Sequence, residues 1–533
     1  MMSTTHRSRK VITLVVTCIG TFMVLLDTTI VVTALPTIQN SLHANLSDLQ
    51  WTIDAYSLPF AALMLTGGTF GDRFGRKRLF LLGLILFVIG SAFCGFAPTL
   101  GWLLFGRVMQ GVGAAALAPG SLSVLAAAFP NPRERTQAIG LWAGVSGLGL
   151  AAGPLAGGLL IQISSWPAIF FVNLPIGIVV LALGLILLAE SRNPDARRID
   201  LPGQVLVTGA LICLTMALIE GGSQGWTSPL ILGLFIGFAV CLLAFLLVEA
   251  RVREPMLPLS LFANRSFSVA NLASLVLGAA MVGAIFFLIQ FFQQVQGYTA
   301  LESALRTLPV TVAIFVAAPF AGVLTARIGP RLPIVLGALL CAASLFLQGT
   351  ILEPGVSYAT IWWHYLLFGI GAGFMLTALA SAVLAATPAN RSGLGSSVLN
   401  TTRQVGIALG IAVLGAFVLN QLPGNITSQL IKRGVSGPMS ATIANKIAAA
   451  GGGASQAPLS GRLPLPPAVL HQAVNQAFVD SFHGAYLILA TALVVSALLV
   501  AFLLQKKQPA TKTSVEATEA PAIQDVVQEE VAG

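Results

Sequence analysis

The stretch GTFGDRFGRKR, residues 68–78, decides how the rest of the sequence is interpreted. It places one acid and four bases between two long apolar runs, so it predicts a short polar turn between two membrane-spanning helices. A shorter echo, GVLTARIGPR, begins at Gly322. Gly68, Arg73 and Gly75 of the first turn align with residues of the second: Gly322, Arg327 and Gly329.

A second echo shows that the repetition extends beyond the turn. QGVGAAAL from Gln110 and FGIGAGFML from Phe368 align Gly111 with Gly369 and Gly113 with Gly371. The two offsets are 254 and 258 residues, so the chain contains two similar halves. Parallel half-repeats related by an axis along the membrane normal are a transporter architecture.

The composition predicts an all-α integral membrane protein. Of 533 residues, 56% are hydrophobic and 9% are charged, and the mean hydropathy is +0.88, whereas a soluble domain carries about 25% charged residues. A spanning helix needs about 20 apolar residues. The sequence predicts fourteen of them: 11–35, 52–71, 79–97, 101–128, 137–163, 168–189, 203–220, 229–248, 267–292, 307–326, 332–351, 358–386, 395–419 and 484–505.

These spans define the predicted domains. Residues 11–190 and 265–505 form two pseudo-symmetric six-helix bundles, and 200–250 supply two inserted helices. The segment 421–483 is the only predicted long loop. We expect its first part to be flexible and its second part to form a short amphipathic helix at the membrane surface. The apolar face of that helix would comprise Leu470, Val474, Phe478 and Phe482. A passive tether is the alternative.

The basic residues predict the orientation. With residues 1–10 in the cytoplasm, 21 of the 28 Lys and Arg residues fall on inner segments. Both termini are then cytoplasmic, the membrane is the cytoplasmic (inner) one, and the acidic tail 506–533 is disordered. The net charge of +9 is explained by topology, so no nucleic-acid partner is needed.

A few ionisable and polar side chains lie inside predicted spans. Asp27 is deep in the first span, where an acid is usually functional or paired, although a hydrogen bond to a neighbouring helix is the alternative. Asp54 begins the second span. It is either an outward proton port or an acid that the helix dipole favours at a helix start. Arg107 and Gln110 share a helical face with Gly111, and Arg107 either pairs with an acid of this half or extends to the outer interface.

The fifth span has a face of small residues. GLGLAAG, residues 147–153, fits a dinucleotide-binding fingerprint, but no strand precedes it and no acid follows about 20 residues on. Its glycines instead continue a helical spacing that allows another helix to approach closely. This face comprises Gly140, Gly149, Gly153, Pro154, Gly157 and Gly158.

Several of these motifs together resemble one family. The turn at 68–78 resembles the loop 2–3 signature of the major facilitator superfamily. LDTTIVVTALP (26–36), GRVMQGVGAA (106–115), the small-residue face, EPMLPLSLF (254–262) and NTTRQVGIALG (400–410) resemble the 14-span drug:proton antiporters of the EmrB/QacA type. Two departures are Val32, where the family usually has Asn, and Trp166-Pro167-Ala168, where it usually has Trp-Arg-Trp.

The resemblance implies a proton-coupled antiporter that exports amphipathic organic compounds by alternating access, with the proton gradient as its energy source and no cofactor. It implies a coupling role for Asp27, Asp54, Arg107 and Gln110. It also implies a conformational latch, in which Asp72 meets a helix start near Ser392–Ser396. Alternatively, the basic residues of this turn serve only to set the topology. The latch residues are Gly68, Asp72, Arg73, Gly75, Arg76 and Lys77.

The sequence leaves alternative roles open for several other side chains. Arg403, next to Gln404, either pairs at the interface of the halves or extends to the cytoplasm. His364 is expected to pack in the core, because no second titratable group lies beside it. Aromatic and Met side chains could line an apolar pocket, although a core or lipid-facing role is favoured for each: Phe286, Phe287, Phe291, Phe292, Met281 and Met375.

Competing functions have weaker support. GGSQG (221–225) fits a nucleophile motif but follows a helix, no phosphate-binding G-x-x-x-x-G-K-[ST] occurs, and the five cysteines form no metal knuckle, so no enzyme is expected. The alternatives are export of a defined metabolite, lipid precursor or siderophore, and, in another class, a membrane receptor or membrane-embedded enzyme. The expected partners are the bilayer, protons and a small substrate, with a periplasmic adaptor and outer-membrane channel as a further option.

Overall fold

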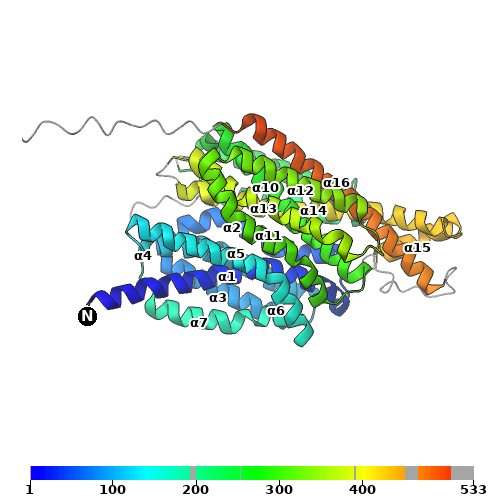
Figure 1. Ribbon diagram of the computed structural model, residues 1–533, viewed down its shortest axis with the longest axis horizontal. Helices are drawn as coiled ribbons and strands as arrows, with labels where there is room; N and C mark the ends of the chain where they lie inside the picture. The colour runs from blue at the N-terminus through cyan, green and yellow to red at the C-terminus, as the bar shows by residue number, and fades with distance from the viewer. Residues whose placement is uncertain (1, 193–199, 253, 389–391, 450–465, 506–533) are drawn as a thin grey trace, which may run out of the picture.

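The computed structural model describes residues 2–192, 200–252, 254–388, 392–449 and 466–505, apart from some side chains within helices (Figure 1). The described chain is helical and contains no strand, as predicted. Its α-helices are α1 (Met2–Leu42), α2 (Leu46–Phe74), α3 (Arg76–Gly95), α4 (Leu100–Ala128), α5 (Pro132–Ile163), α6 (Ala168–Phe171), α7 (Asn173–Leu187), α8 (Leu201–Gln224), α9 (Pro229–Arg251), α10 (Arg265–Gln290), α11 (Ala300–Ile328), α12 (Arg331–Ile351), α13 (Tyr358–Ala386), α14 (Ser392–Ile431), α15 (Gly437–Ala449) and α16 (Pro467–Leu503). Two short elements flank α10: the 3-10 helix η1 (Leu259–Ala263) and the π-helical turn η2 (Phe291–Val295).

The helices have the length and composition of membrane spans. Within the described residues, 13 are long and apolar enough to cross a bilayer, and α6 and α7 together make one of them. The helix α2 is more polar, but its 29 residues can extend about 43 Å and it packs along α4. With α2, each of the fourteen predicted spans coincides with a helix, and the predicted class of an all-α membrane protein is confirmed.

The repeated glycines occupy equivalent helix crossings. A methyl group added at Gly111 of α4 would meet the carbonyl oxygen of Tyr56 in α2, and one added at Gly369 of α13 would meet that of Val310 in α11. Gly113 and Gly371 likewise press on the carbonyl oxygens of Gly83 and Gly337. The offsets of 254 and 258 residues therefore relate α2, α3 and α4 to α11, α12 and α13.

Figure 1 shows the earlier helices, in blue and cyan, on one side of the molecule and the later ones, in green to red, on the other. The inserted helices α8 and α9 form a hairpin, and α8 contacts both α2 and α14. We call the end at which α1 stops and α2 begins the distal end. There α15 and the adjoining ends of α14 and α16 extend away from the end that carries the N-terminus (Figure 1).

The prediction for 421–483 was wrong over most of the described part of that segment. Helix α14 continues to Ile431, and α16 runs unbroken from Pro467 through the last span. Leu470, Val474, Phe478 and Phe482 are buried against other helices of the protein, so this apolar series does not form a separate helix at the membrane surface. Residues 450–465 and the tail 506–533 lie outside the described residues.

Candidate functional site

An Arg–Asp pair lies in the interior of the first half. The Arg107 side chain of α4 is 1% exposed, and its Nη1 donates to Oδ2 of Asp27 in α1, which is fully buried. The Arg107 Nη1 also donates to Gln110 Oε1 at 2.9 Å and its Nε to the Thr52 carbonyl oxygen at 3.0 Å. The guanidinium therefore does not extend to the membrane interface, the alternative open from the sequence.

Further donors fix the second oxygen of Asp27. Its Oδ1 accepts from Gln110 Nε2 at 2.9 Å and from Nδ2 of Asn173, the first residue of α7, at 3.3 Å. Both amide groups also donate to Ser91 Oγ, at 2.8 and 3.3 Å. A charge inside a bilayer is disfavoured, and these donors stabilise the Asp27 carboxylate there. Removal of one partner from a buried ion pair of this kind costs about 3–5 kcal/mol.

Some members of this network carried no sequence signal. Ser91, Asn173 and Thr52 are ordinary polar residues in apolar runs, and only the packing of α3, α7 and α2 brings them to Asp27 or Arg107. The Tyr56 ring also lies 4.4 Å from the Arg107 guanidinium carbon. A polar residue at a helix start, such as Asn173, would be the signal to search for.

Asp54 does not join this network. Its carboxyl group in α2 is fully buried, and neither oxygen has a hydrogen-bond partner among the described residues. One turn earlier, Gln50 Nε2 donates to the Ile411 carbonyl oxygen of α14 at 2.9 Å. Asp54 is therefore inside the protein close to the contact between the halves, and not at the surface.

The turn at 68–78 is fixed within the first half. Asp72 accepts from Arg76 Nε and Nη2, both at 2.8 Å. Gly75 has φ +120, and a side chain there would strike the carboxylate of Glu190, so both conformation and space require glycine. Gly68 has open space around it, Arg73 lies over the Phe74 ring, and Lys77 Nζ donates to the Leu185 carbonyl oxygen at 2.8 Å.

Glu190 is a residue of this turn that the sequence analysis missed. Its carboxylate accepts from the backbone N–H groups of Lys77 at 3.1 Å and Arg78 at 3.3 Å, at the start of α3. An acid at a helix start satisfies unpaired N–H groups and is favoured by the helix dipole. The predicted partner of Asp72 near Ser392–Ser396 falls partly on residues whose side chains are not described, and the contact recorded for Asp72 is with Arg76.

The small-residue face of α5 contacts both halves. Gly149 and Gly157 lie against Phe22 and Ile30 of α1. Gly153 packs on Thr29, and Pro154 lies inside the helix. Gly158 instead packs on α11, where a methyl group would come within 3 Å of the Ala300 carbonyl oxygen and Ala304. The surroundings of Gly140 lie outside the described residues.

Contacts between the halves concentrate at the distal end. In addition to Gln50, Gln293 Nε2 in η2 donates to the Thr33 carbonyl oxygen of α1 at 3.1 Å, and Gln294 Nε2 donates to Gln39 Oε1 at 2.9 Å. Toward the opposite end of α5, Gly144 and Gly147, which lie on the same helix face as Gly158, have nothing within 4 Å. The halves are therefore closed distally and apart at the other end.

Arg403 lies apart from the acids. Its Nη2 donates to Asn400 Oδ1 at 2.7 Å on its own helix, and Gly278 of α10 packs on its carbonyl oxygen. Gln404 beside it is buried. The side chain thus bonds back along α14, to a residue of its own helix.

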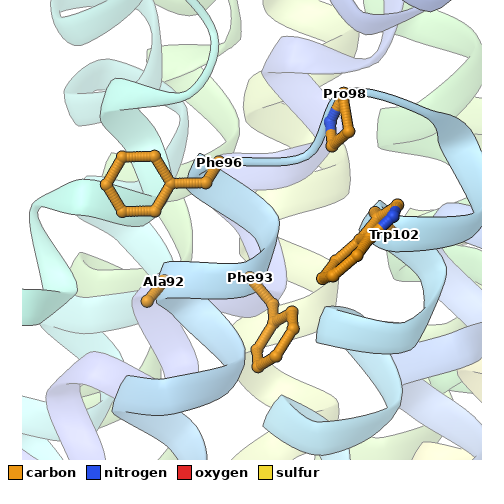
Figure 2. A pocket seen from close by; sticks show the side chains of 5 residues that line it. All are labelled: Ala92, Phe93, Phe96, Pro98 and Trp102. Carbon is orange, nitrogen blue, oxygen red and sulfur yellow. The ribbon is translucent and has the colours of Figure 1, made fainter.

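Two other features can be set aside. Figure 2 shows a pocket at the turn between α3 and α4, lined by Ala92, Phe93, Phe96, Pro98 and Trp102, and it has no charged side chain. Exposed rings such as Phe96 and Trp102 suit the membrane interface. GGSQG ends helix α8 and follows no strand, and no group of three or more metal-ligating side chains occurs in the described chain.

Comparisons with known proteins find one matching family, similar sequences and a similar fold. The family model described as Major Facilitator Superfamily matches residues 17–411. The tetracenomycin C resistance and export protein of Streptomyces glaucescens is 34% identical over 509 residues, covering 94% of this chain and 93% of the relative. The multidrug resistance protein Stp of Mycobacterium tuberculosis is 38% identical over 430 residues, covering 81% and 80%. A crystal structure of a bacterial homologue of the human lysosomal transporter Spinster, inward-facing and unoccupied, has a TM-score of 0.63 at 19% identity, covering 94% of this chain and 99% of that one.

Proposed function

Because the chain belongs to the major facilitator superfamily, we propose that it is a secondary transporter that exports amphipathic organic compounds, drugs among them, in exchange for protons. The similar proteins named for drug and antibiotic resistance support export. The Asp27–Arg107 pair supports the proton coupling, since it is a titratable acid held inside a membrane helix bundle.

The proposed cycle uses two states of this pair. In one state Asp27 is ionised and its carboxylate balances the positive charge of Arg107. The amide of Gln110 donates to the same carboxylate, as in the structure. A proton that enters from outside and binds Asp27 breaks the ion pair and frees the guanidinium, which changes the packing of α1 against α4. Each inward proton supplies about 2.3 kcal/mol per 100 mV of membrane potential, which drives the compound outward. We assign Gln110 to positioning Asp27, and Asp54 to a second proton site near the contact between the halves.

Orientation and motion complete the proposal. We infer from the basic residues that both termini lie in the cytoplasm and that the membrane is the cytoplasmic one, which makes the distal end extracytoplasmic and the structure inward-facing. Residues 11–190 and 265–505 act as the two rocking bundles, with 200–250 inserted between them. The turn at 68–78 acts as the latch on the cytoplasmic side, where Glu190 keeps it in shape. A periplasmic adaptor, where one takes part, would meet the distal extension around α15.

Removal of the distal glutamine contacts is expected to weaken the inward-facing state. Gln293→Ala with Gln294→Ala deletes two hydrogen bonds between the halves, each worth about 0.5–1.5 kcal/mol, so the population shifts roughly fivefold or more toward the outward-open state. Distances between spin labels on the outer ends of α1 and α10 measure this shift.

Gln296→Ala is the matched control for that experiment. Gln296 follows the same π-helical turn, but its amide donates to the Val356 carbonyl oxygen within the second half at 2.9 Å. The control should leave the distance distribution unchanged. A shift of equal size in both variants would mean that the glutamines only stabilise the local helix.

The proposed function is tested by expression in a strain without its own drug exporters. The chain should raise the tolerated concentration of several amphipathic compounds, and dissipation of the proton gradient should remove the effect. Protection limited to one compound would favour the alternative of an exporter for a defined metabolite. No protection and no transport in proteoliposomes would refute export.

A further inference from the structure

Two tyrosine side chains in the second half have no partner for their hydroxyl groups. Tyr365 of α13 and Tyr486 of α16 are both almost fully buried, at 1% and 0% exposure. Neither hydroxyl makes a hydrogen bond within the described chain, although a buried Tyr hydroxyl normally has a partner. They are neutral polar groups on two helices that both pack against α10.

The internal repeat places this site opposite the proton site. Arg107 lies four residues before Gly111, and Tyr365 lies four residues before Gly369, whose helix crossing is equivalent. Where the first half has a charged pair, the second half therefore has a phenol. The two halves differ in chemistry at equivalent positions, as expected if one carries the proton and the other recognises the cargo.

Aromatic rings of α10 and its π-helical turn pack on the two tyrosine rings. The Phe287 ring centroid lies 6.4 Å from that of Tyr486, and the Phe292 ring lies 6.0 Å from that of Tyr365, both edge to face. Phe292 is part of η2, the same turn that carries Gln293 to the other half. Motion of this turn on opening would withdraw Phe292 from Tyr365 and leave room for another ring. π-helical turns are frequent at functional sites.

The charge beside this site indicates which compounds it would accept. The Arg306 guanidinium carbon lies 3.7 Å from the Tyr298 ring centroid and 5.7 Å from that of Tyr358, and Tyr358 also contacts Phe292. The cation-binding ring faces at this end are therefore already occupied by a cation, which repels a second one. Of the described acids within 265–505, Glu302 lies in the first turn of α11 and Glu353 lies beyond the end of α12. Asp480 lies inside α16, where its carboxylate already accepts hydrogen bonds from the amides of Gln429 and Gln476.

We propose that Tyr365 and Tyr486 form the polar part of the substrate site, and that they select an uncharged aromatic compound whose carbonyl or hydroxyl oxygen hydrogen-bonds to both phenols. This inference rests on the proposed export function and names its substrate class. The ring of the compound takes the place that Phe292 holds beside Tyr365 in the inward-facing structure. Organic cations without such an oxygen gain nothing from the two hydroxyls.

Binding of 1,8-dihydroxyanthraquinone to the purified full-length protein tests the proposal. Tyr365→Phe and Tyr486→Phe keep the rings and remove only the hydroxyls, so each should raise Kd about threefold and the double variant about tenfold. Tyr358→Phe is the matched control, because its hydroxyl is already bonded to the Arg306 carbonyl oxygen at 3.1 Å, and its Kd should change less than twofold.

Tetraphenylphosphonium, an aromatic cation with no hydrogen-bonding group, separates recognition from packing. Its affinity should be the same in the wild type and the double variant. The proposal is overturned if the wild type does not bind the anthraquinone, if the double variant binds it normally, or if both probes lose affinity equally. Failure of the transport function looks different: binding would depend on the tyrosines, yet a proton gradient would drive no export.

Discussion

Asp27→Asn is expected to abolish proton-driven export while substrate binding persists. The substitution keeps the shape of the side chain but replaces one acceptor oxygen by an NH2 group and removes the carboxylate, to which the proposal assigns uptake and release of the proton. Without the exchanged proton, the concentration ratio that the transporter can maintain falls by roughly 50-fold at 100 mV for each proton lost. Uptake into inverted membrane vesicles with an imposed pH gradient measures it.

A double variant controls for the loss of stability. Asp27→Asn leaves Arg107 as an uncompensated buried charge, which costs about 3–5 kcal/mol, whereas removal of both charges by Asp27→Asn with Arg107→Gln can be nearly neutral. The double variant should therefore recover thermal stability and remain uncoupled. If proton-driven export returned together with stability, Asp27 would be a structural residue and the coupling assignment would be wrong.

Gly158→Leu is expected to trap the transporter outward-open and stop export. At Gly158, α5 meets α11 so closely that even a methyl group would lie within 3 Å of backbone and side-chain atoms. Overpacking of this kind costs about 1–3 kcal/mol, which shifts the balance of the two conformations by roughly 5- to 150-fold against distal closure. Substrate added on the cytoplasmic side then cannot enter.

Labelling of a single introduced cysteine reports this trap. Gly147→Cys lies in open space on the face of α5 that carries Gly158, and the background lacks Cys18, Cys94, Cys213, Cys241 and Cys341. A membrane-impermeant maleimide applied to inverted vesicles should react about tenfold more slowly when Gly158→Leu is present. Gly144→Leu is the control, since Gly144 has nothing within 4 Å. Equal slowing in both variants would indicate general distortion of α5.

Sequence patterns predicted the fold because they depend on local chemistry. Apolar runs of the right length gave the spans, and the glycine echoes gave the two halves, whose helix crossings the structure reproduces at Gly111 and Gly369. The loop prediction at 421–483 failed because glycine and proline in residues 450–465 suggested irregular structure on both sides, while Leu470 to Phe482 continued a helix.

The site could be predicted only in part. Asp27 and Arg107 could be identified as candidates because charges are rare in spans, and an ion pair between them could be expected. Asn173 and Glu190 were missed because an amide or an acid at the edge of an apolar run has many ordinary roles, and only helix packing brings them to Asp27 and to the start of α3. Sequence also could not show that Tyr365 and Tyr486 both pack on rings of α10 and η2, since 120 residues separate them.

The exchange of substrate for protons is the central claim, and one measurement on the wild type tests it most directly. Purified protein in proteoliposomes, loaded with an exported compound and a pH-sensitive dye, is diluted into medium without the compound. We expect outflow of the compound to acidify the lumen, in a fixed ratio and with loss of the signal in Asp27→Asn. Outflow at the same rate with no change in lumenal pH would contradict the account.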